Sequence, residues 1–399
     1  MPCQHLLFDP ARIPSPCFVL DENQLLTNAA ILNTVQERTG AKILLALKGY
    51  AAWATFPLLS RFKGHGPLWG ACASSVDEAR LAREEFGGEV HSFAAAWNKR
   101  EVAELLTLTD HIVFNSIAQW REFAPAIEAW NQGRCPDRQI QCGLRINPEH
   151  SEGAAEIYNP CAPGTRFGVS AEQLPDQLPA HIEGFHCHCH CESGADVFAR
   201  TLVHIEDHFA KWFPQIKWIN FGGGHLMTRA DYDVDALVAL LRGFHARYPW
   251  LRIILEPGSA FGWQTGPLVS QVVDIVEDSG IRTAVLNVSF TCHMPDCLEM
   301  PYHPAVRGAR VVEADAPGDH VYRLGGCSCL SGDFMASWQF DHALSVGENV
   351  IFEDMLHYTA VKTTMFNGIH HPSIALLHTD GELEHLRDYS FSDYRSRMD

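Results

Sequence analysis

The sequence lacks the features that would place the protein in a membrane, outside the cell or on nucleic acid. No uninterrupted apolar run is long enough to span a bilayer, and the N-terminal MPCQHLLFDPARIPSP has no basic start followed by an apolar stretch, so we expect neither a membrane span nor a signal peptide. Basic residues are scarce: 30 Lys and Arg stand against 48 Asp and Glu, a formal net charge of −18. This balance disfavours nucleic acid and anionic membranes as partners and suits a cationic substrate, although acidity is also common among bacterial cytosolic enzymes.

Cysteine spacing excludes a disulfide scaffold. No CxxC pair occurs among the 13 cysteines, and their number is odd. Reduced thiols are the expected state in a long chain without an export signal, so we expect a cytoplasmic protein. Low-complexity segments and close internal repeats are also absent, and 399 residues exceed one small core, so we expect two domains.

What the sequence contains instead is an alternation of short apolar runs with helix-like segments. A helix-like segment at 22–40 precedes the first run, another at 49–62 follows it, and Ser75 with Glu78 fits a capping box. Eight strand–helix units predict an α/β fold, a closed (β/α)8 barrel of the TIM type, over residues 22–258. The eight predicted strands are 41–48, 67–72, 89–94, 111–115, 140–147, 181–188, 216–224 and 251–258.

After Gly258 the pattern changes to that of an all-β domain. Strand-like runs follow one another, and the last holds an Asp380-Gly381 hairpin signal. We expect a C-terminal all-β domain over 259–399, joined by a strand from the N-terminal segment 1–21, where IPSPCFVL is strand-like. The predicted runs after Gly258 begin at Pro267, Thr283, His320, Asn349 and Ile374.

A barrel carries its chemistry at the carboxyl ends of its strands. Lys48 ends the first predicted strand. In a dry barrel mouth, burial would lower the pKa of this lysine and make its amine a nucleophile, whereas on a strand edge it would only reach into solvent. Glu256 ends the eighth strand and either faces the mouth or caps the following loop.

Three consecutive glycines end the seventh predicted strand, at Gly222, Gly223 and Gly224. Such a run brings backbone N–H groups close to an anion, and we favour a phosphate cradle over a plain turn. Lysine, glycine cradle and carboxylate together meet the needs of pyridoxal phosphate: covalent attachment, phosphate binding and a protonated ring nitrogen.

The stretch GFHCHCHCES, residues 184–193, alternates histidine with cysteine. Residues two apart share a face of a regular strand, so His186, His188 and His190 could together bind zinc. The sixth strand should end within this stretch, however, which puts His186 deep in the barrel, His188 at its mouth and His190 in the loop. A flat imidazole at the mouth can stack on a pyridine ring, and no fourth ligand or zincin spacing is visible. We therefore favour stacking and expect no metal.

Longer motifs give a resemblance that covers nearly the whole chain. The chain resembles the carboxynorspermidine (carboxyspermidine) decarboxylases, a group of fold-type III, alanine-racemase-like pyridoxal-phosphate enzymes. HMPD-LEMP, CLSGD and Y-x7-FNG are its specific motifs. The matching stretches, in order from residue 14 to 368, are PSPCFVLDE, LALKGY, YNPCAPGTRFG, GFHCH…CE, INFGGGH, EPG, HMPDCLEMPYHP, GGCSCLSGDF and HYTAVKTTMFNG.

The resemblance implies how the cofactor is held. Lys48 is the Schiff-base lysine, His188 stacks on the ring and Glu256 pairs with the pyridine nitrogen. Tyr358 reaches the phosphate, although on its own it would be interpreted as a core tyrosine. The glycines that bind the phosphate are Gly222, Gly223 and Gly224.

The resemblance also implies how the substrate is treated. Cys329 stands near the α-carbon as proton donor, and Asp333 contacts the amine end of the substrate; by default they are a structural thiol and a turn residue. Family members are homodimers in which the CLSGD loop enters the partner's active site. The implied reaction is loss of CO2 from carboxynorspermidine to give norspermidine, or from carboxyspermidine to give spermidine.

Asp296 and Glu299, in MPDCLEMP, are by default solvated loop charges. The acidic loop and the cationic substrate motivate a different hypothesis. In it, these two carboxylates bind the secondary and terminal ammonium groups of a long polyamine.

Two departures weaken an assignment to the related ornithine or diaminopimelate decarboxylases. Those enzymes carry arginine after EPG, where this chain has Ser259, and a Gly-Ser pair where it has His190 and Cys191. Three further alternatives stay open. A racemase needs a second base opposite the lysine, a cofactor carrier releases no CO2, and a zinc hydrolase is inactivated by chelators.

Overall fold

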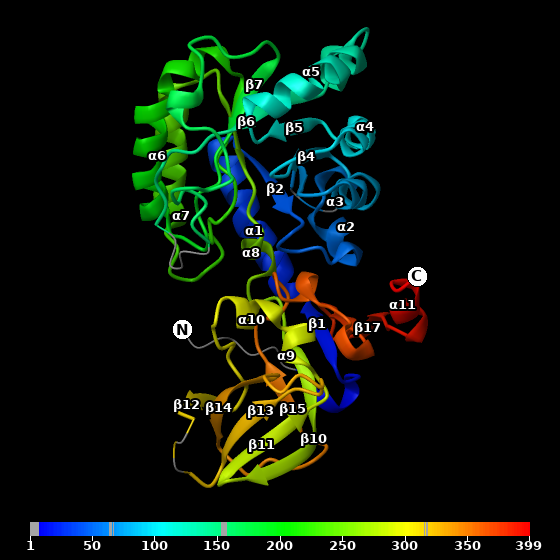
Figure 1. Cartoon of the computed structure of the whole chain (residues 1–399). Helices are drawn as coiled ribbons and strands as arrows, with labels where there is room; N and C mark the ends of the chain where they lie inside the picture. The colour runs from blue at the N-terminus through cyan, green and yellow to red at the C-terminus, as the bar shows by residue number, and fades with distance from the viewer. Residues whose placement is uncertain (1–7, 64–65, 67, 153–157, 315, 317) are drawn as a thin grey trace. The chain divides into compact units, whose positions relative to one another are not determined.

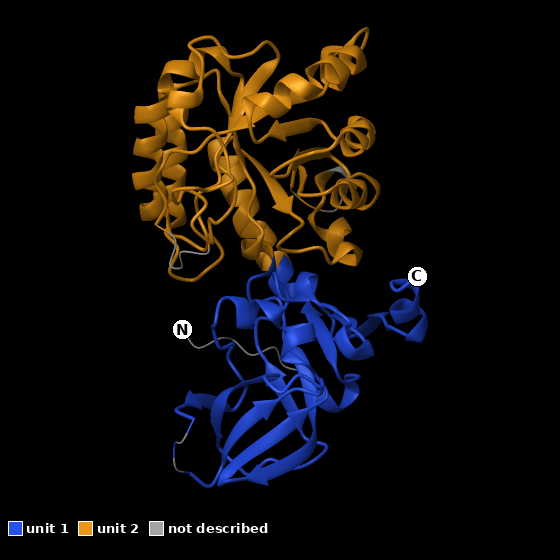
Figure 2. Cartoon of the chain, in the orientation of Figure 1, with its two compact units in different colours: residues 1–25, 262–399 blue, residues 26–261 orange. Residues whose placement is uncertain are grey.

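The structure is a computed structural model that describes residues 8–63, 66, 68–152, 158–314, 316 and 318–399. The chain divides into two compact units (Figure 2). One unit is Leu26–Phe261. The other combines Met1–Leu25 with Gly262–Asp399, so the chain leaves this unit once and returns to it.

The unit Leu26–Phe261 is a closed barrel of eight parallel strands with helices around it (Figure 1). Each strand pairs with the next, and the barrel closes where Lys42 and Ile43 pair with Ile254 and Leu255. This confirms the predicted (β/α)8 fold. Its strands are β2 (Lys42–Ala46), β3 (Gly70–Ala73), β4 (Glu89–Phe93), β5 (His111–Phe114), β6 (Gln141–Arg145), β7 (Ile182–His186), β8 (Trp218–Asn220) and β9 (Arg252–Leu255).

Trp218 fills the middle of the barrel and explains why two of its strands carry glycine. A Cβ atom on Gly184 would lie 2.0 Å from the indole of Trp218, and one on Gly143 would lie 2.3 Å from it. The fully buried ring packs with Leu44, Val113 and Ile254. The barrel is therefore a packed core below its mouth, and chemistry is confined to the strand ends.

Helices separate most of the strands, but the segment after β2 differs from the prediction. In place of one helix over 49–62 there are short turns around a single turn of α-helix, because Ser60 forms a bridge with Leu68 and ends it. The helices of the barrel region are α1 (Glu22–Thr39), α2 (Phe56–Leu59), α3 (Val76–Leu81), α4 (Lys99–Leu108), α5 (Ile117–Asn131), α6 (Ala195–Phe209), α7 (Val234–Arg247) and α8 (Ser259–Gly262).

The predicted capping box at the start of α3 forms only in part. The Ser75 hydroxyl accepts the Glu78 N–H at 3.1 Å, as the motif requires. The Glu78 carboxylate, however, accepts the N–H of Ser74 at 2.6 Å. The second half of the box is thus shifted by one residue.

The other unit is built on one mixed nine-stranded sheet, in the order β12-β14-β13-β11-β10-β1-β16-β17, with β15 also on β10. The N-terminal strand β1 joins it by pairing in parallel with β16 and antiparallel with β10. The strands are β1 (Cys17–Asp21), β10 (Leu268–Asp278), β11 (Ile281–Leu286), β12 (Ala309–Val312), β13 (Val321–Gly325), β14 (Phe334–Phe340), β15 (Asn349–Phe352), β16 (Ser373–Leu377) and β17 (Leu383–Arg387).

The β-domain confirms the predicted fold class, with two strands that the sequence did not reveal. β12 has only four residues, two of them exposed, and β14 follows the CLSGD loop directly. The run predicted from Thr283 stops at Leu286, and helices α9 (Phe290–His293) and α10 (Pro295–Glu299) follow; α11 (Phe391–Ser396) lies near the C-terminus. Within the described residues, no helix combines the length and apolarity needed to cross a membrane.

Candidate active site

Lys48 and His188 meet at the carboxyl ends of β2 and β7. The amine nitrogen of Lys48 lies 3.4 Å from Nε2 of His188. The sequence left open whether Lys48 is buried in the mouth or reaches into solvent; β2 ends at Ala46, so Lys48 lies in the turn beyond it and its side chain is exposed.

A backbone contact fixes the tautomer of His188. The N–H of Gly223 donates to its Nδ1 at 3.1 Å, so a neutral ring carries its proton on Nε2, the nitrogen that faces Lys48. Burial, followed by the charges of Lys48 and Arg145, holds the pKa of His188 well below its usual range. The imidazole is therefore neutral near pH 7, with its Nε2 facing the Lys48 amine.

Glu256 lies beside this pair with both carboxylate oxygens engaged. Asn220 donates to Oε1 at 2.6 Å, and Nε2 of His186 lies 3.2 Å from Oε2. Burial alone would raise the pKa of Glu256, but His186, His91 and Asn220 outweigh it and lower the pKa to about 2. The carboxylate is ionised at neutral pH.

The three glycines pack too closely for any other residue. A Cβ atom would lie 2.7 Å from Cβ of His188 on Gly222, 2.4 Å from the Glu256 carbonyl oxygen on Gly223, and 2.3 Å from the His190 backbone on Gly224. Gly222 also donates its N–H to Oδ1 of Asn220 at 2.8 Å, and Gly223 donates to His188. Of the three, only Gly224 has an N–H that bonds to no other described residue.

The alternating stretch 184–193 does not gather its histidines on one face, because β7 ends at His186. His186 points to Glu256, His188 to Lys48, and His190 lies 5.1 Å from His225, ring centre to ring centre. Three thiols cluster instead: the sulfur of Cys189 lies 3.3 Å from that of Cys187 and 3.5 Å from that of Cys161.

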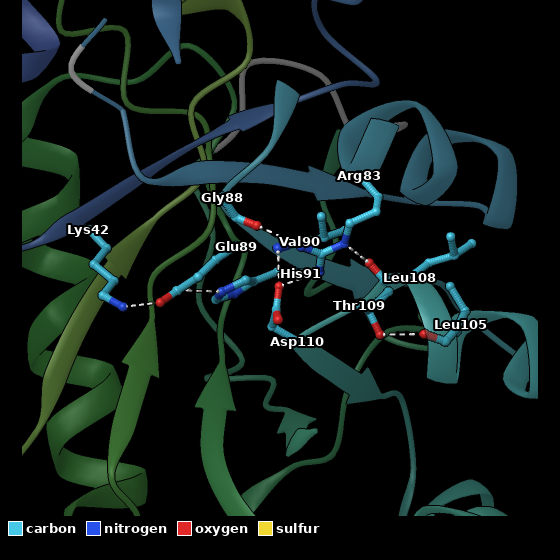
Figure 3. A network of polar contacts seen from close by, with 10 residues as sticks. All are labelled: Lys42, Arg83, Gly88, Glu89, Val90, His91, Leu105, Leu108, Thr109 and Asp110. Atoms are coloured by element: carbon cyan, nitrogen blue, oxygen red, sulfur yellow. Dashed lines mark hydrogen bonds and ion pairs between the residues drawn. The ribbon is translucent and has the colours of Figure 1, made fainter. Parts of the chain in front are cut away.

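Beneath the mouth, the barrel floor holds a network of charged groups (Figure 3). Lys42 pairs with Glu89, whose carboxylate lies 3.2 Å from Nε2 of His91. The ligand atoms of Glu89, His91 and His111 lie within 4.8 Å of one another, a spacing compatible with a metal ion. The two imidazoles, however, are stacked at 3.8 Å with planes only 10° apart, so their lone pairs do not converge, and Lys42 already neutralises Glu89. We interpret this cluster as an internal ion network.

The CLSGD residues belong to the other unit. Cys329 is exposed, and its N–H donates to Oδ1 of Asn367 at 3.0 Å. Asp333 is buried, and its carboxylate accepts the N–H groups of Thr291 at 3.1 Å and Ser328 at 3.2 Å. Asp333 therefore braces the loop that presents Cys329.

Asp296 and Glu299 share α10 but differ in environment. Asp296 is 6% exposed, and its Oδ2 accepts hydrogen bonds from Tyr302 and Thr359, each at 2.7 Å. Its Oδ1 is buried and bonds to no described group. Glu299 is exposed and pairs with Lys362. Asp296 thus keeps one acceptor for a further donor, whereas Glu299 already has a cation.

Tyr358 is half-buried and holds a backbone conformation that side chains rarely adopt, with φ of 54°. A tyrosine in this left-handed region indicates that its environment fixes it there. The next residue, Thr359, is the one that bonds to Asp296.

Sequence reasoning missed Asn220 and Arg145, and it placed His186 deep in the barrel without pairing it with Glu256. Asn220 and His186 hold Glu256. Arg145 donates to the carbonyl oxygen of His188 at 3.0 Å, and its guanidinium lies over the rings of Phe93 and Phe167. The strands themselves offered a signal for these residues, because side chains alternate between the two faces of a strand. Each of the three occupies the last position of its strand: Asn220, His186 and Arg145.

Comparison with known proteins defines the class first. Residues 17–355 match the family described as "Pyridoxal-dependent decarboxylase, C-terminal sheet domain". The protein is a pyridoxal-phosphate-dependent decarboxylase built on a barrel and a sheet domain.

Individual relatives then narrow the family. The chain is 49% identical to a carboxyaminopropylagmatine decarboxylase of Synechocystis over 97% of this chain and 96% of the relative. It is 38% identical to a carboxynorspermidine/carboxyspermidine decarboxylase of Campylobacter jejuni, over 97% and 99%. A crystal structure of a C. jejuni carboxynorspermidine decarboxylase complexed with norspermidine aligns with a TM-score of 0.86 at 37% identity, covering 96% of this chain and all of that one. The chain therefore belongs to the carboxynorspermidine/carboxyspermidine decarboxylase family, whose enzymes act in polyamine biosynthesis.

Proposed function

We propose that this enzyme decarboxylates a polyamine precursor that carries a carboxylated aminopropyl group, with carboxyaminopropylagmatine as its preferred substrate. The relative named for that substrate shares 49% identity, against 38% and 33% for two relatives named for carboxynorspermidine and carboxyspermidine. The structural observation that carries the proposal is the unpartnered, buried oxygen of Asp296, which suits a cationic substrate group.

The residues at the barrel mouth fit pyridoxal phosphate. Lys48 offers an exposed amine for covalent attachment, His188 a flat neutral ring, and Glu256 an ionised carboxylate for a protonated pyridine nitrogen. The N–H of Gly224 bonds to no other described group and can serve the phosphate, whereas Gly222 and Gly223 act by letting the loop pack closely. From the family resemblance, we propose that Tyr358 also reaches the phosphate. When bound, the cofactor supplies an electron sink for the electron pair that CO2 leaves behind.

The chain's own groups act around that chemistry. Nε2–H of His188 faces the Lys48 nitrogen and holds the lysine side chain at the mouth of the barrel. His186 and Asn220 keep the Glu256 carboxylate ionised and fixed. From the family resemblance, we propose that Cys329 donates a proton to the α-carbon after CO2 leaves and that Asp333, whose carboxylate accepts two loop N–H groups, holds the Cys329 loop.

A long cationic substrate requires carboxylates away from the reacting carbon. Asp296 offers its free oxygen to a secondary ammonium or a guanidinium group. Glu299 must first release Lys362, so its contribution is smaller. Carboxynorspermidine and carboxyspermidine, which place a primary ammonium at the far end, are the second candidates, supported by the related structure that holds norspermidine.

Asp296→Asn tests this assignment. The amide oxygen can still accept from Tyr302 and Thr359, but the charge is lost. A hydrogen bond to a charged group contributes about 1.5–3 kcal/mol, so we expect kcat/KM to fall about 10- to 100-fold, mainly through KM. Glu299→Gln is the control and should change kcat/KM by less than about threefold.

The substrate ranking is tested with wild-type enzyme. We expect kcat/KM for carboxyaminopropylagmatine to exceed the values for carboxynorspermidine and carboxyspermidine. The reverse order would make the second candidates the substrates. If Asp296→Asn keeps the wild-type kcat/KM on all three substrates, Asp296 does not bind a cationic group of the substrate.

A further inference from the structure

We propose that His204 and His208 form a binding site for a divalent transition-metal ion, built from residues that the decarboxylase site does not use. Both lie in the last turns of α6, four residues apart, and therefore on one face of the helix. Two histidines at this spacing on a helix form the metal-binding pair of several zinc enzymes. Nickel, zinc and copper ions are the class that imidazole prefers.

The orientation of the two rings matches this role. Their centroids lie 6.1 Å apart and their planes cross at 82°. An ion bonds in the plane of each imidazole, at about 2.0–2.1 Å from the nitrogen, so two rings can share it only if their planes intersect at the ion. Rings that share a tetrahedral ion have centroids about 5 Å apart, which small side-chain rotations would reach from the present separation.

The same criterion rejects the other close imidazole pairs. His91 and His111 have planes 10° apart, and so do His150 and His204, so neither pair can direct two lone pairs at one point. His190 and His225 cross at 47° but are only 6% and 1% exposed, which excludes the waters that must complete a two-histidine site.

The nitrogens of His204 and His208 are available. Within the described residues neither ring takes part in a hydrogen bond or an ion pair, and both side chains are half-buried. Nδ1 of His208 is buried without a partner, so Nε2 is the nitrogen on its accessible edge. His150 stacks on His204 at 4.0 Å and limits its rotation without covering its edge.

The surrounding charge does not oppose a cation. The guanidinium of Arg200, one turn before His204, is bound by both oxygens of Glu152 at 2.7 Å. The protein as a whole carries a formal charge of −18. A bound ion would link two turns of α6 and stabilise the folded chain over the unfolded one.

Calorimetric titration of the cofactor-loaded enzyme with NiCl2 tests the proposal. Wild type should bind one ion at least about tenfold more tightly than His204→Gln/His208→Gln, and each single variant should lose most of that difference, because chelation needs both rings. Saturating Ni²⁺ should raise the Tm of wild type, but not of the double variant, by about 2 °C or more.

His245→Gln is the matched control, since His245 is an exposed histidine of α7. It should bind Ni²⁺ as wild type does. Equal Ni²⁺ affinity in wild type and in the double variant, with equal Tm in EDTA to show that both fold, would overturn the site. If His245→Gln loses as much Ni²⁺ affinity as the double variant, the site is also overturned, because Ni²⁺ binding would then be spread over scattered histidines.

Discussion

At the scale of single residues, the barrel mouth holds two ionisable groups in different charge states: the imidazole of His188 is neutral and the carboxylate of Glu256 is ionised. His188 follows β7 and Glu256 follows β9, the strands on either side of β8. Both side chains are largely buried, and each is held in its protonation state by a different cause. Burial and the charge of Lys48 keep His188 neutral, whereas donors from His186 and Asn220 keep Glu256 charged. Environment, more than residue type, assigns these two roles.

The low pKa of Glu256 predicts a pH-dependent stability. A carboxyl whose folded pKa lies near 2, against 4.5 in the reference state, stabilises the fold fully above about pH 4.5 and loses that contribution as the pH falls toward 2. Unfolding free energies of wild type and Glu256→Gln should therefore differ most at pH 7, and the difference should shrink by about 2 kcal/mol by pH 3.

The control is Glu382→Gln, which changes an exposed glutamate of the β16–β17 hairpin. Its effect on unfolding should stay within about 0.5 kcal/mol at every pH. A wild-type minus Glu256→Gln difference that is constant from pH 7 to pH 3 would mean that the hydrogen bonds of Glu256 do not favour its ionised form.

At the scale of elements, the strand ends carry the site because the loops behind them are tightly packed. The loop after β8 lies against the ends of β7 and β9, with its Gly223 N–H bonded to His188 and the Glu256 N–H bonded to the Gly222 carbonyl at 2.7 Å. These contacts leave no room for a side chain on the loop.

That packing predicts that Gly223→Ala disturbs the end of β9. Its Cβ would lie 2.4 Å from the carbonyl oxygen of Glu256, a backbone atom that can move only with the end of β9. We expect at least a tenfold loss of cofactor affinity, read from the absorbance of bound pyridoxal phosphate during titration. Gly243→Ala, in α7, where the nearest atom is the end of Arg247 at 3.7 Å, should keep wild-type affinity.

Periodicity predicted the elements better than the contacts between them. The eight barrel strands were visible because each is a short, mostly buried apolar run, whereas β12 is short and half exposed. Lys48, His188 and Glu256 were found as strand-end residues, but their partners were not. The exposure of Lys48 depends on β2 ending two residues early, and the Glu299 pair with Lys362 joins residues 63 positions apart; neither has a local signal.

At the scale of the whole molecule, the proposed residues are divided between two compact units. Lys48, His188 and Glu256 belong to the barrel, and Cys329, Tyr358 and Asp296 to the sheet unit. The family resemblance implies that the Cys329 loop serves the active site of a second copy. We therefore propose a homodimer with shared sites.

Mixing two inactive variants tests this arrangement. Lys48→Ala and Cys329→Ala should each have little activity alone. If each site takes its lysine from one copy and its thiol from the other, subunit exchange would restore one complete site in each mixed dimer, roughly a quarter of wild-type activity at equal amounts. No recovery, although exchange is shown by differently tagged chains, would place both residues of each site in one copy.

The central claim is that this chain removes CO2 from carboxylated polyamines. The most direct test is CO2 release by the purified protein with pyridoxal phosphate, measured on carboxyaminopropylagmatine, carboxynorspermidine, carboxyspermidine, ornithine and diaminopimelate. We predict release from one or more of the first three and none above background from the last two. Release from ornithine or diaminopimelate alone, or from no substrate, would contradict the account.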